Sequence, residues 1–161
     1  MMTPTEKLLA IEEIRLLKAR YFRFLDSHDW AGFRGLFTDD AVFAPPKPPV
    51  ADGAADVFEK DEEIRGADAF VVWASGRLEG VHSAHLGYMP EIEILSATDA
   101  KAVWGMEDIL RSPDRDVHGY GYYKEHYVCQ AGAWRIKRWE LYYKSMEVAD
   151  RSHTGSRIVM F

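Results

Sequence analysis

The second half of the chain constrains the fold most, because long strand-like runs follow one another there with only short turns between them. The runs, rich in β-branched and aromatic residues, are 82–95, 101–110, 120–129 and 134–145. The turns between them are 96–99, 112–119 and 131–133. Connections this short join only antiparallel neighbours in a sheet. The sequence therefore predicts an antiparallel meander, with the helices of the first half gathered on its concave face.

A long helix is predicted at the start of the chain. Thr3 and Glu6 have the spacing of a capping box, and Pro4 stands at the first helical position. We expect this helix to run to about Ser27. Its apolar residues recur at the three- and four-residue spacing of one buried face, namely Ile11, Ile14, Leu17, Tyr21, Phe24 and Leu25.

Shorter elements are predicted between this helix and the strands. Asp29 can cap a short second helix that ends before Thr38 and carries the stripe Trp30, Phe33 and Phe37. Residues 41–43 allow one short strand, and the proline-rich stretch that follows makes 44–57 a loop. A strand near Phe58 is possible from the pattern, and a third helix should span 67–77 with Phe70 and Trp73 facing inward.

Length and charge exclude several classes of protein. The 161 residues suit one domain over 1–161, with 145–161 as a C-terminal extension that matches no pattern. The net charge of −6 and the scattered basic residues argue against nucleic-acid binding. The sequence has neither eighteen apolar residues in a row nor a secretory signal, and its one cysteine cannot form an internal disulfide. We therefore expect a cytoplasmic protein that does not bind membranes.

Common catalytic motifs are missing from the sequence. It contains no glycine-rich phosphate loop, no G-x-S-x-G and no H-E-x-x-H. His82 and His85 have a spacing seen in some metal sites. Residues three apart in a regular strand point to opposite faces, so these two histidines would share an ion only across a bulge. We predict no metal and no cofactor.

Acid and base candidates are more informative. Asp26 follows the buried stripe of the first helix, where a carboxylate is costly without a partner. His85 lies in the first long strand, and a carboxylate that accepts from one imidazole nitrogen makes the other nitrogen a better base. The alternative is that Asp26 caps the helix corner and His85 is a core histidine. Tyr21, five residues before Asp26, either borders the same cavity or is a core tyrosine.

Aromatic residues are frequent throughout the strands and the third helix. They could line an apolar pocket for a ring-containing ligand, or they could simply pack in the core. The candidates are Trp73, Tyr88, Trp104, Tyr120, Tyr122, Trp139, Tyr142 and Tyr143.

The order of several sequence blocks resembles a known family. The first half contains AIEEIRLLKARYFRFLDSHDW and then LFTDDAVF. The second half contains VHSAHLGYMPEIEI, WGMEDIL, GYGYYKEHY and WRIKRWEL. Together these blocks cover most of 11–143, and they resemble the SnoaL-like and scytalone dehydratase-like proteins of the NTF2-like superfamily. The resemblance implies an α+β cone, with three helices packed on a curved, mixed and mostly antiparallel sheet.

The resemblance also implies a catalytic site. Dehydratase-like members work without metal or organic cofactor, tend to form homodimers or homotrimers, and pair an Asp at the end of the first helix with a strand His. Tyr21, Asp26 and His85 fall on the catalytic positions. This chain departs from many relatives at Leu86 and Tyr122, where they have histidines, and at Tyr143, where they often have an arginine. The residues that could stand in for a second acid are Tyr122, Tyr143 and His126.

These observations lead to one main functional hypothesis and two alternatives. We expect a cofactor-independent lyase or isomerase whose Asp26–His85 base acts on a hydrophobic, steroid-like or polyketide-like ring compound. The residues predicted to contact that substrate are Trp73, Tyr88, Trp104, Tyr122, His126 and Tyr143. One alternative is a non-catalytic ligand-binding or assembly module of the same fold. The other activates water with a further carboxylate in the cavity, for which Asp108 or Glu107 would serve.

Overall fold

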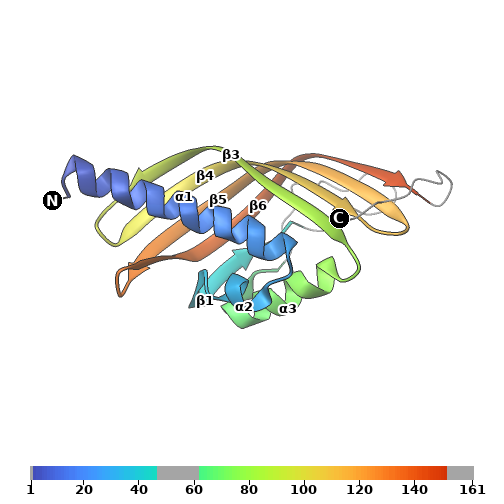
Figure 1. Ribbon diagram of the computed structural model, residues 1–161, viewed down its shortest axis with the longest axis horizontal. Coiled ribbons are helices and arrows are strands. Elements are labelled where there is room, and N and C mark those ends of the chain that lie inside the picture. The colour runs from blue at the N-terminus through green and yellow to red at the C-terminus, as the bar shows by residue number, and fades with distance from the viewer. Residues whose placement is uncertain (1, 47–61, 152–161) are drawn as a thin grey trace.

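The computed structural model describes residues 2–46 and 62–151, in which three helices lie on a six-stranded sheet. The elements in chain order are α1 (Pro4–Asp26), α2 (Trp30–Arg34), β1 (Phe37–Ala44), β2 (Ile64–Arg65), α3 (Ala67–Leu78), β3 (His82–Ile94), β4 (Asp99–Arg111), β5 (Arg115–Gln130) and β6 (Ala133–Asp150). The sheet order is β2-β1-β6-β5-β4-β3, and only β1 and β6 pair in parallel. The predicted α+β cone with a mixed, mostly antiparallel sheet is confirmed. Figure 1 shows α1 crossing the long strands, with α2 and α3 below it.

Helix α1 begins as the sequence predicts. The Thr3 hydroxyl accepts a hydrogen bond from the backbone of Glu6, and the Glu6 carboxylate accepts one from the backbone of Thr3 at 2.6 Å. The buried face of the helix includes a charged residue, Lys18, together with Ile14, Leu17, Tyr21 and Leu25, while the expected Ile11 and Phe24 are only half-buried. Phe22 lies against β3, where a Cβ at Gly87 would come within 2.6 Å of its ring. A glycine in β3 therefore lets α1 approach the sheet closely.

The second helix and the first strand differ from the prediction. Helix α2 ends at Arg34, and Phe37 opens β1 instead of completing a helical stripe. The reason is tertiary, because β1 pairs in parallel with β6 and the Phe37 backbone lies opposite Ile136. The Phe37 ring still reaches the core, with its centroid 5.0 Å from that of Phe33. The predicted strand near Phe58 and most of the predicted loop lie outside the described residues, and β2 follows them.

The meander is confirmed, and three of its strands are longer than predicted, β5 and β6 by the most. β5 starts at Arg115, so the turn covers only 112–114 and not 112–119. Residues 115–119 look like turn residues alone, yet they pair with β4 on one side and with 146–150 of β6 on the other. Residues 145–150, assigned to an extension from the sequence, therefore belong to the sheet. Residues 152–161 lie outside the described part of the chain.

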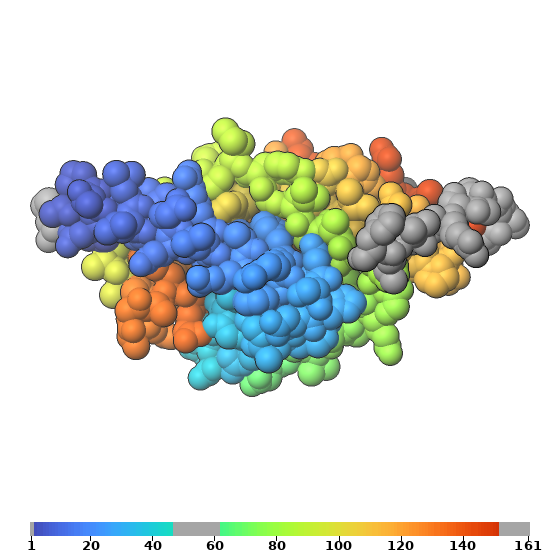
Figure 2. Space-filling view, viewed as in Figure 1, coloured from blue at the N-terminus to red at the C-terminus, as the bar shows by residue number. Residues whose placement is uncertain are grey.

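An aromatic core joins the helices to the sheet at its β1 side. The rings of Phe43 and Phe70 stack with centroids 3.7 Å apart, and Trp139 packs beside them at 5.1 Å from Phe70. In the space-filling view α1, α2 and α3 cover this side of the molecule (Figure 2). In the described part of the chain, none of the helices has the length and apolar character needed to cross a membrane.

Candidate active site

The last residue of α1 and the inward face of β3 form a hydrogen-bonded pair. Asp26 Oδ1 lies 2.6 Å from His85 Nδ1, and the same oxygen accepts from the Ser83 hydroxyl at 2.8 Å. Asp26 Oδ2 accepts from the His85 backbone N–H at 2.9 Å. The end of a helix disfavours a negative charge, so these three donors hold a carboxylate that the helix alone would not stabilise. The structure brings together the two residues that the sequence pairs.

The pair sets the protonation of the imidazole. An ionised Asp26 can only accept, so the neutral His85 ring places its proton on Nδ1 and leaves Nε2 as the basic nitrogen. Burial alone would lower the pKa of His85, but the charge of Asp108 and the hydrogen bond and charge of Asp26 outweigh it. The net pKa of His85 is raised above its usual value of 6.5. His85 is thus a stronger base than an isolated imidazole.

His85 opens on a cavity between the helices and the curved sheet. The cavity volume is about 290 Å³, at the lower end of the ~300–1,000 Å³ typical of small-molecule sites. Its apolar wall includes Leu25, Trp73, Val81, Leu110, Leu141 and Met146. Its polar lining comprises Tyr21, Arg77, His85, Asp108, Ser112, Arg115, Tyr123 and Tyr143. An apolar wall with polar groups that converge on it is typical of small-molecule sites.

A second carboxylate, Asp108 of β4, lies in the cavity. Its side chain is buried and accepts hydrogen bonds from the Tyr143 hydroxyl at 2.6 Å and the Tyr123 hydroxyl at 3.4 Å. Burial and the charge of Asp108 raise the pKa values of both phenols well above the usual range, so both stay protonated as donors. The Tyr143 ring lies over Gly119, where a Cβ would come within 2.4 Å of it. Gly119 therefore makes room for the phenol that holds Asp108.

Tyr21 also lines the cavity, although it is only 2% exposed. Burial and the charge of Glu125 raise its pKa, which keeps its hydroxyl protonated. The Trp139 indole is close enough to lower the pKa of Tyr21 slightly, yet its buried Nε1 has no hydrogen-bond partner of acceptable geometry. The cavity lining therefore includes a protonated phenol, with the buried indole of Trp139 beside it.

A buried ion pair packs against the Tyr21 ring, and nothing in the sequence indicated this pair. Lys18 Nζ lies 2.7 Å from Glu125 Oε1, with both side chains fully buried. The ammonium also sits 3.9 Å from the Tyr21 ring centroid and 3.7 Å from that of Tyr123. Tyr127 donates to the other Glu125 oxygen. These contacts join α1 to β5 and fix the Tyr21 ring between them.

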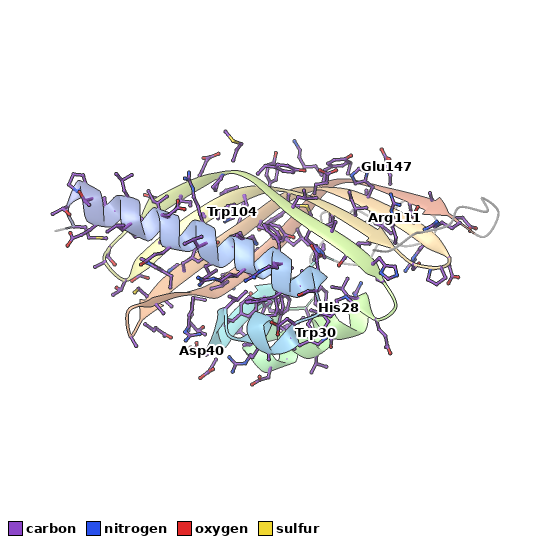
Figure 3. The ribbon with its side chains drawn as sticks, viewed as in Figure 1. His28, Trp30, Asp40, Trp104, Arg111 and Glu147 are labelled. Atoms are coloured by element: carbon purple, nitrogen blue, oxygen red, sulfur yellow. The ribbon has the colours of Figure 1, made fainter. Side chains whose placement is uncertain are left out.

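Four residues predicted to contact the substrate do not line this cavity. Trp104 is buried under α1, where its indole N–H donates to Tyr127 at 3.0 Å (Figure 3). Tyr88, Tyr122 and His126 lie on the opposite face of the sheet. Tyr88 donates there to Glu107, and His126 pairs with an aspartate at the start of β4. Trp73 and Tyr143 are the two predicted contacts that do line the cavity.

Strand alternation explains which other polar side chains face the same side of the sheet as His85. Ser83 shares the face of His85 because the two are separated by two positions. In β4, Trp104, Met106 and Asp108 are buried in alternation, which leaves Glu107 on the other face. Of the two carboxylates considered for the cavity, the structure therefore places Asp108 there.

In the described part of the chain, no group of three or more metal-ligating side chains is placed to hold a metal ion.

Comparison with protein families decides the relationship. The model of the SnoaL-like domain matches residues 6–140. The chain belongs to the SnoaL-like family. Its fold is accordingly consistent with the NTF2-like superfamily, as the sequence resemblance indicates.

Several solved structures share this fold. A scytalone dehydratase candidate from Novosphingobium aromaticivorans has a TM-score of 0.77 at 20% identity, covering 90% of this chain and 91% of its own. A hexachlorocyclohexane dehydrochlorinase from Novosphingobium barchaimii has a TM-score of 0.74 at 14% identity, covering 98% and 99%. A protein of unknown function from Mycobacterium tuberculosis has a TM-score of 0.69 at 24% identity, covering 89% and 77%. At these identities the likeness is one of fold.

Proposed function

We propose that this SnoaL-like protein is a cofactor-independent lyase or isomerase in which His85 is the general base and Asp26 its partner. The observation that carries the proposal is the 2.6 Å contact between His85 Nδ1 and Asp26 Oδ1, with the imidazole at the wall of an apolar cavity. The substrate is a compact, hydrophobic ring compound. Dehydration is the reaction we favour, in keeping with the scytalone dehydratase candidate that shares the fold.

The proposed elimination needs one base and one proton donor. Nε2 of neutral His85 takes a proton from the carbon beside a substrate carbonyl, and the electrons of that C–H bond form the new double bond. The hydroxyl on the neighbouring carbon leaves with its bonding electrons and receives the proton from the imidazolium, so that the products are an alkene and water. Asp26 stabilises the imidazolium while it exists.

Two further groups suit this step. The protonated Tyr21 hydroxyl can donate to the substrate carbonyl oxygen as negative charge develops there. Asp108 adds a negative charge that favours the imidazolium. A substrate whose double bond only shifts would use the same proton abstraction, which makes isomerisation the related outcome.

The two alternative functions fit the site less well. An assembly module would not need an open cavity, whereas here the imidazole borders open space. A ligand-binding module would need the cavity but would have no use for the Asp26–His85 pair. A water-activating carboxylate must accept from water, and each oxygen of Asp108 already accepts from one tyrosine, which leaves only its remaining lone pair for that role. The geometry therefore favours a histidine base. The homodimer or homotrimer and the cytoplasmic location stay predictions.

The test is turnover of a panel of cyclic β-hydroxy ketones and thioesters, followed by the absorbance of the conjugated product. His85→Gln and Asp26→Asn should each lower the rate by about 100-fold to 10,000-fold, the usual contribution of a positioned base. His126→Gln is the matched control, because His126 pairs with Asp99 on the outer face. Full turnover by a folded His85→Gln variant would rule out the mechanism.

A further inference from the structure

Two arginines stand at the rim of the cavity. Arg77 lies in the last turn of α3 and Arg115 is the first residue of β5, and both are exposed yet line the cavity. Within residues 2–46 and 62–151, neither guanidinium has a carboxylate partner. Other arginines on this surface do have one, such as Arg34, which lies 2.7 Å from both Asp39 and Asp68. The two rim charges are therefore not used to hold the described part of the fold.

Local contacts hold both arginines in place. The Arg77 guanidinium carbon lies 5.1 Å from the Trp73 ring centroid, a cation–π contact that leaves its N–H groups available. Ser112 closes the turn before Arg115 by accepting from its backbone N–H at 3.2 Å and donating to its carbonyl at 3.1 Å. Such positioning lowers the entropy that a ligand must overcome to engage either side chain.

The charges of the cavity are arranged along its depth. The interior holds Asp108 and the Asp26–His85 pair, while the cations stand at the mouth. Burial and Asp108 raise the pKa of Tyr143, and Arg77, which lines the same cavity, is near enough for its charge to oppose part of that rise. The rim and the reacting centre are therefore neighbours. An anionic group on a ligand would be repelled from Asp108 and attracted to the rim, which orients the rest of the ligand inward.

The negative net charge of the whole chain makes the two positive charges at the rim significant. A protein with a net charge of −6 repels anions in general, so an anionic ligand requires a local cationic site. Guanidinium groups are suited to such a site because their planar N–H groups bind carboxylate, sulfate and phosphate oxygens in pairs. Neutral ring compounds would gain nothing from two charges at the cavity mouth.

We propose that the natural substrate is an amphiphilic ring compound whose anionic substituent binds to Arg77 and Arg115 at the rim while its ring occupies the cavity beside His85. This deepens the proposed function and rests on it for the identity of the reacting site. The shared chemistry of the substituent is that of a carboxylate, sulfate or phosphate.

The experiment compares two fluorescent probes that share their rings and differ in charge. Anilinonaphthalene sulfonate is anionic, and phenylnaphthylamine is the same ring system without the sulfonate. The purified full chain should bind the sulfonate at least about tenfold more tightly, the scale expected for charge-assisted hydrogen bonds at a partly exposed site. This preference should shrink as salt is added. It should vanish in the Arg77→Gln/Arg115→Gln double variant, with the affinity for phenylnaphthylamine unchanged.

Arg111→Gln is the matched control, since it removes the same charge from an exposed position of β4 that does not line the cavity (Figure 3). Arg111→Gln should keep the preference for the sulfonate probe. Equal affinity for the two probes, or a preference that survives in the double variant, would overturn the inference. So would a failure of both probes to bind. The His85→Gln variant separates this proposal from the catalytic one, because it should lose turnover and keep the probe preference.

Discussion

Asp26 and His85 are 59 residues apart in the sequence, yet Asp26 Oδ1 and His85 Nδ1 lie 2.6 Å apart. The contact joins the end of α1 to the inward face of β3. Asp26 is also held by Ser83 and by the His85 backbone, so its position does not depend on the imidazole alone. Replacing the histidine side chain should therefore leave the carboxylate in place, which makes substitutions here informative.

The raised pKa of His85 predicts how stability depends on pH. The folded state binds the His85 proton more tightly than the unfolded state does, so this group stabilises the fold fully below the ordinary pKa of about 6.5. That contribution is lost as the pH rises through the higher pKa of the folded protein. The free energy of unfolding, measured with urea, should fall across this pH interval in the wild type. The fall should be smaller in His85→Gln. Identical pH dependence in the two proteins would contradict the assignment.

Asp108 should act on His85 through its charge. Asp108→Asn removes a nearby negative charge and should lower the pKa of His85, which proton NMR of the imidazole ring can follow. Glu107→Gln is the control at the adjacent position, because Glu107 bonds Tyr88 and His118 on the outer face. An unchanged His85 pKa in Asp108→Asn would show that the two groups are not coupled.

Gly119 should matter to catalysis through Tyr143. An alanine there would place a Cβ 2.4 Å from the Tyr143 ring, so the ring must shift and disturb the hydrogen bond from its hydroxyl to Asp108. We expect Gly119→Ala to lower turnover between about tenfold and 100-fold, since displacements of about 1 Å carry such costs. Gly76→Ala is the control, because a Cβ there meets nothing within 4 Å. If Gly119→Ala keeps full turnover, Tyr143 has no part in positioning the site.

The buried Lys18–Glu125 pair should dominate the stability of the contact between α1 and β5. Lys18→Met leaves Glu125 charged and unpaired in the core, which should lower the free energy of unfolding by about 3–5 kcal/mol. Adding Glu125→Gln should recover much of this loss, because a neutral amide still accepts from Tyr127. Lys7→Met, at an exposed position of the same helix, should change little. If Lys18→Met lowers the free energy of unfolding only slightly, the ion pair is not isolated from water.

The sequence predicts the parts of this fold that depend on local signals. The capping box at Thr3 and Glu6 sets the start of α1, and the regular turns of the second half set the meander. The spacing of Phe37 from Trp30 and Phe33 is helical, so local sequence favours a helix there. The competing pairing is with β6, whose residues come about a hundred positions later in the chain. Residues 115–119 were assigned to a turn for the same reason. Long-range pairing overrides local propensity at both places.

The site was predictable where family position or alternation identifies a residue. Asp26 and His85 are acid and base candidates from their places in the chain, and the resemblance puts them on catalytic positions. The alternation of β4 accounts for Asp108. Tyr122 and His126 share one strand face because they are four residues apart, but the sequence gives no sign of which face lines the cavity. Lys18 could not be anticipated, because an isolated lysine in a helix is usually exposed and its partner lies 107 residues away.

Titration of His85 by nitrogen-15 NMR tests the central claim most directly, since it reports both the pKa and the tautomer of the imidazole. The account predicts a neutral ring with its proton on Nδ1, a pKa above the usual 6.5, and a fall of that pKa in Asp26→Asn. A neutral ring protonated on Nε2, or a pKa at or below 6.5 that Asp26→Asn leaves unchanged, would contradict the claim that Asp26 makes His85 the base.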